Sequence, residues 1–258
     1  MLRFFGVQEA FSLSTLLSVV TNPTVTAKGL EPRYVNSSLP VNFGMLLFPA
    51  FQALDVFGPL DALNILSWQQ PTNLYLISDT LDPVSTKPIS ASMNKLNSNF
   101  SQSIVPTHTH ATAPPLDVLL VPGGLGTRAP APDLAATIAY INTTFPSLQH
   151  LITICTGAGL AARAGVLNGL DATTNKRAWN ATTALGPGVR WIAEARWVRA
   201  AGGKVWTSSG VSAGIDATLA WMEEVFGEGV AEEVSVGMEY ERARDWRDDP
   251  FAGYYGLV

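Results

Sequence analysis

From residue 42 onward, short and continuous apolar runs alternate with longer segments whose apolar residues recur at helical spacing. The runs "FGMLLF", "LYLIS", "LDVLLV" and "LITI" lack the alternation of polar and apolar residues that marks a strand with one solvent-exposed face. Continuous apolar strands are typical of parallel sheets, because the connecting helices cover both faces of such a sheet. The pattern therefore predicts an α/β fold in which helices flank a mainly parallel central sheet on both faces.

Residues 1–40 do not share this alternation, and we interpret them as an N-terminal extension that precedes one domain at residues 41–258. Arg3 precedes a partly apolar segment that ends near Val20, which is the outline of a secretory signal. Glu9 interrupts that segment and no clear small-residue cleavage site follows, so a cytoplasmic protein is expected and a secreted one is the alternative. Secretion would make glycosylation candidates of four Asn-x-Ser/Thr motifs, which begin at Asn36, Asn99, Asn142 and Asn180.

Charge and composition exclude several classes of protein. A net charge of −5 and a charged fraction of 14% do not indicate the excess of basic residues that is typical of nucleic-acid-binding proteins. No apolar run reaches the ~18 residues that a membrane-spanning helix needs, so a membrane is not an expected partner either. A single cysteine, Cys155, excludes a disulfide within the chain and a multi-cysteine metal site. His108 and His110 in "PTHTH" could touch a metal, but solvated histidines are the favoured interpretation and no metal is expected.

Cys155 lies in "TICTGAG", between an apolar strand and a helix rich in small residues. A residue at such a turn lies close to the amino end of the helix, where backbone N–H groups favour an anion. We therefore expect the thiol pKa to fall from about 8.5 toward neutrality, which would make Cys155 a nucleophile. Gly157 and Gly159 supply the small neighbours that a sharp turn of this kind requires. The alternative is a buried cysteine that acts as a small apolar residue.

Two further segments are expected beside Cys155, because sites in parallel α/β sheets form beyond the carboxyl ends of the strands. In "VPGG", the N–H groups of Gly123 and Gly124, together with that of Thr156, are candidates for an oxyanion hole. In "FQALDVFGP", Asp55 is a carboxyl group among apolar residues, where a raised pKa would let it exchange a proton with a substrate. The alternative for Asp55 is a helix cap.

Four segments together resemble the ThiJ/PfpI superfamily, which includes the parkinsonism-associated DJ protein, the PfpI proteins and isonitrile (isocyanide) hydratase. They are "GMLLFPAFQALDVFGPLDAL", "DVLLVPGGLG", "ITICTGAGLAARAGVLNGLDATTNK" and "VWTSSGVSAGIDATLAWMEEVFG". The resemblance extends over about residues 42–245 and is greatest to the isonitrile hydratase branch. It implies a flavodoxin-like three-layer sandwich, a fold shared with class I glutamine amidotransferase domains, and a homodimer.

The same resemblance assigns roles to the candidate residues. It implies that Cys155 is the nucleophile and Asp55 its acidic partner, and that Thr156 and Gly124 lie against the substrate. In the hydratase branch, the thiolate attacks the carbon of the isonitrile and an N-substituted formamide is released, without a metal or an organic cofactor. The resemblance thus implies a cofactor-independent, cysteine-dependent hydratase or lyase that acts on a small electrophilic molecule.

Two positions depart from the family pattern. Thr156 follows the nucleophile where the protease-like members have a histidine, which argues against peptidase activity. Asn175 follows "ATT" where many hydratase-like members have His-Trp, so we expect a divergent branch with its own substrate. His110 or His150 could supply the missing imidazole if the fold brings one of them close.

Two other functions stay open from the sequence. One is a non-enzymatic redox sensor or a stress or developmental regulatory protein, in which Cys155 would be oxidised to the sulfinic stage. The other is a regulatory module, because related domains are fused to DNA-binding helices. We rank this function lowest, because the chain is acidic and no helix-turn-helix segment is visible after the core. Among other charged residues, Asp216 is expected at a helix start or an interface, and Arg163 and Lys176 are expected to be solvated.

Overall fold

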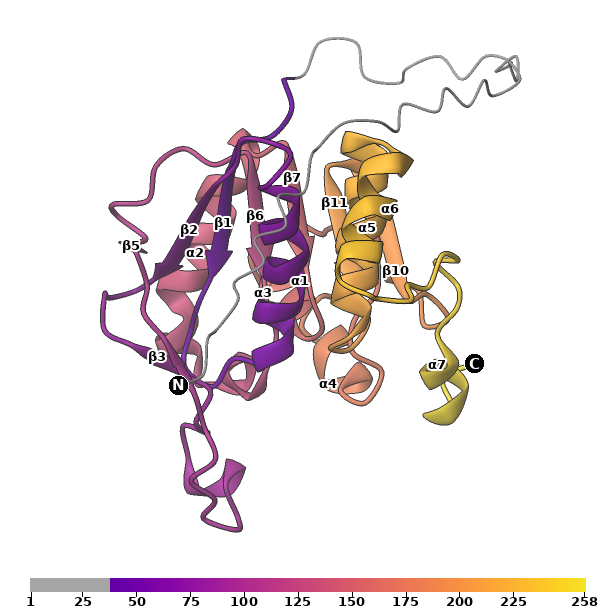
Figure 1. Ribbon diagram of the computed structural model, residues 1–258. Coiled ribbons are helices and arrows are strands. Elements are labelled where there is room, and N and C mark those ends of the chain that lie inside the picture. Colours follow the sequence, from indigo (N-terminus) through magenta and orange to yellow (C-terminus); the bar gives the residue numbers. More distant parts are fainter. Residues whose placement is uncertain (1–37) are drawn as a thin grey trace, which may run out of the picture. The chain divides into compact units, whose positions relative to one another are not determined.

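In the computed structural model, which describes residues 38–258, seven strands form a central sheet in the order β10-β11-β7-β6-β1-β2-β5 (Figure 1). Neighbouring strands in this sheet are parallel except β10 and β11. This arrangement confirms the predicted mainly parallel sheet. The strands are β1 (Asn42–Leu46), β2 (Asn73–Ser78), β5 (His108–Thr109), β6 (Val118–Val121), β7 (His150–Thr153), β10 (Trp197–Ala200) and β11 (Val205–Ser208).

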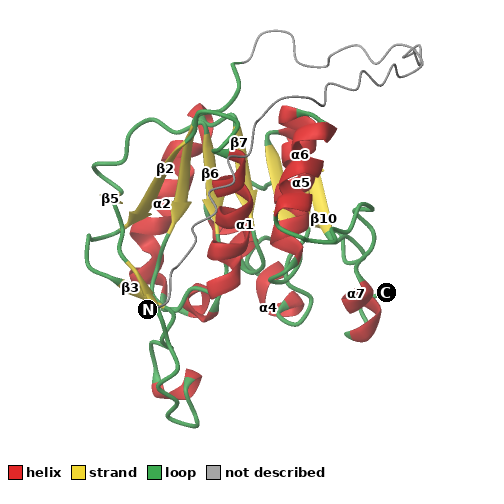
Figure 2. Ribbon diagram, in the orientation of Figure 1, coloured by secondary structure: helices red, strands yellow, loops and turns green. Residues whose placement is uncertain are grey.

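Helices cover both faces of the sheet, as the sequence predicts (Figure 1, Figure 2). On one face, α1, α5 and α6 pack against one another, and on the other face α2 packs against α3. The result is the three-layer sandwich of the flavodoxin-like class. The helices are α1 (Ala53–Leu66), α2 (Ala135–Thr144), α3 (Gly157–Arg163), α4 (Trp179–Thr183), α5 (Ala213–Phe226), α6 (Glu228–Gly237) and α7 (Pro250–Tyr254).

Shorter elements occupy the connections between these layers. Strand β3 pairs with β4 in an antiparallel sense, and β8 pairs with β9 in a parallel sense. The short strands are β3 (Val84–Ser85), β4 (Ser103–Ile104), β8 (Asp171–Ala172) and β9 (Arg190–Trp191), and the 3₁₀ helices are η1 (Ala91–Met93), η2 (Leu125–Arg128), η3 (Ala131–Leu134), η4 (Phe145–Ser147) and η5 (Ala201–Gly203). No helix within residues 38–258 is long and apolar enough to cross a membrane.

Every residue of β6 and β7 is buried, because these strands lie in the middle of the sheet between the two helix layers. Leu119, Leu120 and Ile152 have no solvent exposure. Burying an aliphatic side chain of this size contributes about 1.5–3 kcal/mol, so these strands give a rigid base to the loops that follow them. Trp221 of α5 is also fully buried and packs edge-on against Phe43 of β1, with ring centroids 5.9 Å apart.

The described residues, Ser38–Val258, cluster into one compact unit. This unit begins close to the domain boundary predicted at residue 41. Apart from residues 38–40, the segment interpreted as an extension and candidate signal lies outside the described residues, and so does the glycosylation motif at Asn36. One domain at residues 41–258 therefore stays a prediction.

Candidate active site

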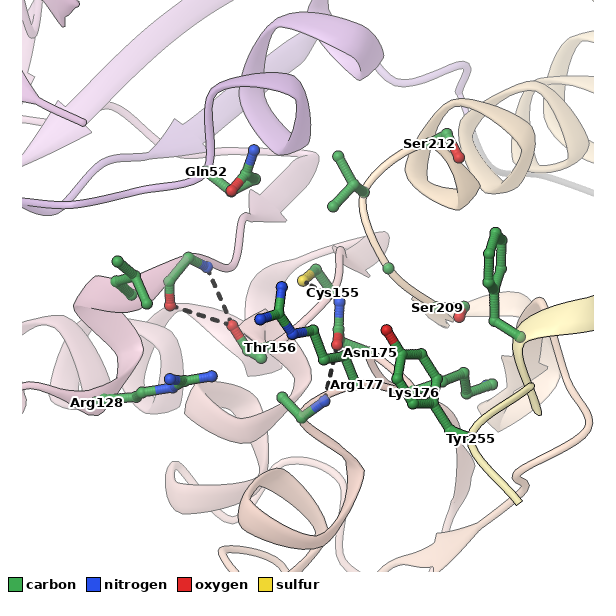
Figure 3. A pocket seen from close by; sticks show the side chains of 16 residues that line it. Gln52, Arg128, Cys155, Thr156, Asn175, Lys176, Arg177, Ser209, Ser212 and Tyr255 are labelled. Carbon is green, nitrogen blue, oxygen red and sulfur yellow. Dashed lines mark hydrogen bonds between the residues drawn. The ribbon is translucent and has the colours of Figure 1, made fainter. Parts of the chain in front are cut away.

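Four loops meet at the carboxyl edge of the sheet around a cavity of about 710 Å³ (Figure 3). Gln52 lies after β1, Gly124 after β6, Cys155 after β7, and residues 209–212 after β11, and all of them line the cavity. The sequence predicts the first three loops to converge here. It misses the loop after β11, because that loop contributes backbone and small side chains rather than groups with recognisable chemistry.

Cys155 has a φ of 57°, a left-handed conformation that residues other than glycine rarely adopt. Its N–H donates to the carbonyl of Ser209 at 3.2 Å, and its carbonyl accepts the Thr174 hydroxyl at 2.8 Å. Gly157 is required shortly after it, because a Cβ there would overlap the carbonyl oxygen of Val121. The sharp strand-to-helix turn is therefore present, and hydrogen bonds from two other segments hold its strained backbone in place.

The sulfur of Cys155 lies among hydrogen-bond donors rather than among apolar groups alone. The Nδ2 of Asn175 donates to Sγ at 3.2 Å, and the backbone N–H groups of Thr156 and Val211 also interact with the sulfur. The N–H of Ala178 donates to the Oδ1 of Asn175 at 2.9 Å, which leaves Nδ2 to face the sulfur. All three donors favour the thiolate, so this environment can stabilise negative charge on sulfur during a reaction. The sequence singles out Asn175 as a departure from the family pattern but does not predict this contact.

The resting thiol is nevertheless neutral at physiological pH. Burial and the nearby Asp55 carboxylate raise the pKa of Cys155 to about 12, and Cys155 is only 5% exposed. The expectation of a thiol pKa near neutrality is therefore wrong. The helix behind the turn, α3, has only seven residues and begins at Gly157, and the cost of removing a charge from water outweighs its field. Cys155 consequently needs a base before it can act as a nucleophile.

Asp55 lies in the first turn of α1 and is fully buried. Its Oδ2 accepts the N–H of Gly123 at 2.9 Å, whereas its Oδ1 has no hydrogen-bond partner among the described residues. Burial raises the pKa of Asp55 to about 7, although the Gly123 N–H and the Cys155 thiol both act to lower it. The carboxylate does not cap α1, so the helix-cap alternative is wrong. Asp55 is instead a carboxyl group that can gain and lose a proton near neutral pH beside the thiol.

Gly123 and Gly124 hold the polar side chains around Cys155. The N–H of Gly123 donates to Asp55, and the N–H of Gly124 donates to the Thr156 hydroxyl at 3.0 Å. Gly124 has a φ of 132°, and a Cβ on it would lie 2.6 Å from the carbonyl oxygen of Ala50, so a larger residue does not fit. Both N–H groups already have acceptors within the protein. The two glycines therefore position Asp55 and Thr156, and their role as an oxyanion hole stays a prediction.

Lys176, expected to be solvated, is buried, and that expectation is wrong. Its Nζ donates to the Thr173 hydroxyl and to the carbonyl of Ala195, both at 2.6 Å, and lies 3.5 Å from Oδ2 of Asp249. Burial lowers the pKa of Lys176 to about 8, and Asp249 opposes that shift. Asp249 also caps α7 by accepting the N–H of Phe251 at 3.0 Å. The ion pair therefore ties the C-terminal helix to the loop that follows β8.

Asp216 lies in the first turn of α5, as expected, but its role is to hold the fold together. It is fully buried, and its Oδ2 accepts Nη2 of Arg196 at 2.6 Å. Its Oδ1 accepts the hydroxyl of Tyr240 at 3.1 Å. These contacts join α5 to two neighbouring segments, and Asp216 does not line the cavity.

Neither His110 nor His150 supplies an imidazole to the cavity. His110 follows the edge strand β5 and stacks on Tyr140, with ring centroids 4.8 Å apart. His150 lies at the amino end of β7, opposite the end that carries Cys155, and its Nδ1 is 2.9 Å from the carbonyl oxygen of Gly203. In the part of the chain that the structure describes, no group of three or more His, Cys, Asp or Glu residues could hold a metal ion.

Comparison with known proteins identifies the family of this chain. The profile of the DJ-1/PfpI family matches residues 43–224, which is more than half of the chain. The chain belongs to the DJ-1/PfpI family. It is 31% identical over 205 residues to isonitrile hydratase of Pseudomonas putida, a match that covers 80% of this chain and 81% of that protein. This family membership confirms the resemblance noted from the four sequence motifs.

Solved structures of DJ-1/PfpI proteins share the fold. A ThiJ/PfpI family protein from Pseudomonas syringae superposes with a TM-score of 0.66 at 26% identity, covering 91% of this chain and 93% of that chain. Drosophila melanogaster DJ-1beta superposes with a TM-score of 0.62 at 18% identity, covering 78% of this chain and 98% of that chain. A transcriptional regulator, GbdR of Pseudomonas aeruginosa, is 23% identical over 87% of this chain, which spans only 57% of the regulator.

Proposed function

We propose that this DJ-1/PfpI family member is a cofactor-independent hydratase that adds water to an isonitrile and releases an N-substituted formamide. One observation carries the proposal: the buried Asp55, with a pKa of about 7, lies beside the neutral thiol of Cys155 at the wall of a polar cavity. A carboxyl group that titrates near neutral pH can take a proton from the thiol and return it to a substrate. The 31% identity to an isonitrile hydratase supports the choice of substrate class.

The first step forms a carbon–sulfur bond. Sγ of Cys155 bonds to the terminal carbon of the isonitrile, while the thiol proton passes through Asp55 to the same carbon. The product is a thioimidate, R–N=CH–S, attached to the enzyme, with no net change in charge. The donors around sulfur, Asn175 Nδ2 and the N–H groups of Thr156 and Val211, stabilise the negative charge that develops on sulfur as its proton leaves.

The second step consumes water and regenerates the thiol. Asp55 accepts a proton from water as the oxygen adds to the thioimidate carbon, and the same proton then passes to the nitrogen. The tetrahedral adduct, R–NH–CH(OH)–S, then breaks its carbon–sulfur bond. The sulfur leaves with a proton delivered through Asp55 as the hydroxyl becomes the carbonyl of R–NH–CHO. One isonitrile and one water give one formamide, without a metal or redox partner.

The alternative of a redox sensor has less support. Oxidation by peroxide proceeds through the thiolate, which is scarce because the pKa of Cys155 is about 12, and the 5% exposure of Cys155 limits access of peroxide to the sulfur. Peptidase activity is disfavoured as well, because Thr156 rather than histidine follows the nucleophile and no histidine lines the cavity. A regulatory role in the manner of GbdR has no specific feature of the cavity in its favour.

The direct test is to incubate the protein with a simple alkyl isonitrile and to quantify the formamide by mass spectrometry. Cys155→Ala should abolish turnover, and Asp55→Asn should lower kcat by roughly 10²- to 10⁴-fold. Asp61→Asn is the matched control, because Asp61 is an exposed carboxylate on the same helix. Intact-protein mass spectrometry should detect a thioimidate whose added mass equals that of the isonitrile. Turnover that persists in Cys155→Ala would disprove the proposal.

A further inference from the structure

Two arginines face the cavity without a counter-ion among the described residues. Arg128, at the end of η2, and Arg177, two residues after Asn175, both line it. Figure 3 shows the side chain of Arg177 reaching toward Cys155 and Thr156, and that of Arg128 beyond Thr156. Neither guanidinium group forms an ion pair with a residue of the described part of the chain. Each is therefore free to bind a ligand.

The free state of these two residues is unusual in this protein. Within residues 38–258, six other arginines each pair with an aspartate or a glutamate; they are Arg190, Arg196, Arg199, Arg242, Arg244 and Arg247. Arg163 is the remaining described arginine without an ion pair, and it lies outside the cavity lining. The pairing pattern thus places two of the three unpaired guanidinium groups at the candidate site.

The rest of the lining leaves this positive charge uncompensated. Among residues 38–258, no aspartate or glutamate lines the cavity, although the whole chain has a net charge of −5. The third lining cation, Lys176, is already engaged with Asp249. Asp55, behind the cavity wall, has no solvent exposure. A cavity with two free guanidinium groups and no lining carboxylate favours an anionic ligand over a neutral or cationic one.

We propose that the cavity binds a small substrate that carries a negatively charged oxyanion group, a carboxylate or a phosphate, and that Arg128 and Arg177 bind that group. A guanidinium group suits this task, because its planar set of N–H donors matches the two oxygens of an oxyanion. The aromatic side chains of Phe251 and Tyr255 line another part of the cavity and can pack against an apolar portion of the substrate. The identity of the reacting group, an isonitrile carbon, rests on the proposed function. The preference for an anionic substrate depends only on the two arginines.

A pair of alkylating reagents tests the anion preference without knowledge of the substrate. Iodoacetate and iodoacetamide react with the same thiol but differ in charge, and Cys155 is the single cysteine of the chain. At low ionic strength, the ratio of the iodoacetate rate to the iodoacetamide rate should be roughly tenfold higher for Cys155 than for glutathione. Added salt should lower the ratio. A ratio equal to that of glutathione, in protein that still unfolds cooperatively, would overturn the proposal.

Charge-neutralising variants assign the preference to the two arginines. Arg128→Gln and Arg177→Gln should each move the ratio toward the glutathione value, whereas Arg163→Gln, which removes the same charge outside the cavity, should leave it unchanged. An equal decrease in all three variants would reflect net charge alone and would contradict the assignment. Protection of Cys155 by acetate or by inorganic phosphate then distinguishes a carboxylate from a phosphate ligand.

Turnover separates this inference from the proposed reaction. If the protein hydrates isonitriles, kcat/KM should be roughly tenfold higher for a carboxylate-bearing isonitrile than for its methyl ester, and Arg177→Gln should remove that advantage. If the protein shows the reagent preference but hydrates no isonitrile, the anion site is supported and the proposed reaction is disproved. If the protein hydrates both isonitriles equally and shows no reagent preference, the proposed reaction is supported and the anion site is disproved.

Discussion

At the scale of single residues, several positions around Cys155 are unfavourable for folding. Cys155 and Val211 have φ values of 57° and 50°, which are costly for any residue with a Cβ and more so for a β-branched one. Asp55 is buried, and one of its oxygens lacks a hydrogen-bond partner in the described part of the chain. Each of these features directs a polar group toward the thiol. These features cost stability rather than contribute to it.

The sequence predicts the raised pKa of Asp55 correctly but gives the wrong direction for the pKa of Cys155. The position of Cys155 between a strand and a helix, and of Asp55 after another strand, follows from local patterns. The pKa values depend instead on burial and on donors such as Asn175 and Val211, which other segments bring to the sulfur. Those contacts form only in the folded protein. A prediction based only on the position of Cys155 near the amino end of a helix therefore gives the wrong direction for the thiol pKa.

We expect Asp55→Asn to stabilise the fold above neutral pH. The folded-state pKa of about 7 lies above the ordinary value of 3.8, so protonation of Asp55 favours the folded state. The stability that this group contributes is fully present below about pH 4 and is lost as the pH rises to about 7, a loss on the order of 4 kcal/mol. Denaturant unfolding should show that the variant is more stable than the wild type at about pH 8 but not at about pH 4. A similar gain in the exposed control Asp61→Asn would contradict this explanation.

Asn175→Ala should make Cys155 less reactive. The substitution removes the amide that donates to Sγ at 3.2 Å, so the thiol pKa should rise further. A hydrogen bond to a charged group contributes about 1.5–3 kcal/mol, and alkylation of Cys155 by iodoacetamide should slow by roughly threefold to tenfold at a fixed pH. Asn180→Ala, at an exposed position of α4, is the control and should react as the wild type does. Faster alkylation of Asn175→Ala would show that the amide shields the sulfur rather than stabilising its charge.

At the scale of elements, α7 is one of the parts of the fold that the sequence does not predict. The C-terminal segment "DWRDDPFAGYYGLV" predicts irregular structure, because it is rich in turn-forming and aromatic residues. A five-residue helix forms there, with Pro250 at its first position and the Asp249 side chain as its cap. Such a helix is too short to show helical periodicity in sequence. The long helices and the apolar strands are predicted correctly, because their burial leaves a regular pattern.

Asp249→Asn should destabilise the protein because it leaves the buried charge of Lys176 unpaired. Asparagine can still cap α7, but Lys176 would remain buried without its ionic partner, which costs about 3 kcal/mol. The denaturant midpoint should fall for this variant, whereas Asp248→Asn, at the exposed neighbouring position, should leave it unchanged. Adding Lys176→Met to Asp249→Asn should restore much of the lost stability, because the unpaired charge is then absent. A double variant no more stable than Asp249→Asn would show that the unpaired charge of Lys176 does not cause the loss.

At the scale of the whole molecule, the sheet order explains why the site forms where it does. The strands β1, β6, β7 and β11 lie near the centre of the sheet and run in the same direction, so the loops after them meet at one edge. From the strand–helix alternation, the sequence predicts that the loops after β1, β6 and β7 converge, but not that the loop after β11 joins them. It does not show which side chains of the loops reach one another. The homodimer that the family resemblance implies stays a prediction, which light scattering would test by a mass twice that of one chain.

The amino-terminal boundary of the domain can be tested by truncation. A chain that begins at Ser38 retains all of the sheet, and we expect its free energy of unfolding to match that of the full chain within roughly 1 kcal/mol. A chain that begins at Phe43 loses the N–H groups of Val41 and Asn42, which both donate to Asp117 Oδ2 at 2.9 Å, and should lose about 1–3 kcal/mol.

A chain that begins at Leu47 lacks β1, which lies between β2 and β6, and should not fold, because two central strands would lose their partner. Chemical denaturation of the four chains, followed by tryptophan fluorescence, measures these differences. A chain beginning at Ser38 that unfolds with a much lower midpoint than the full chain would place part of the domain before residue 38. A chain beginning at Phe43 that is as stable as the full chain would place the boundary inside β1 rather than at residue 41.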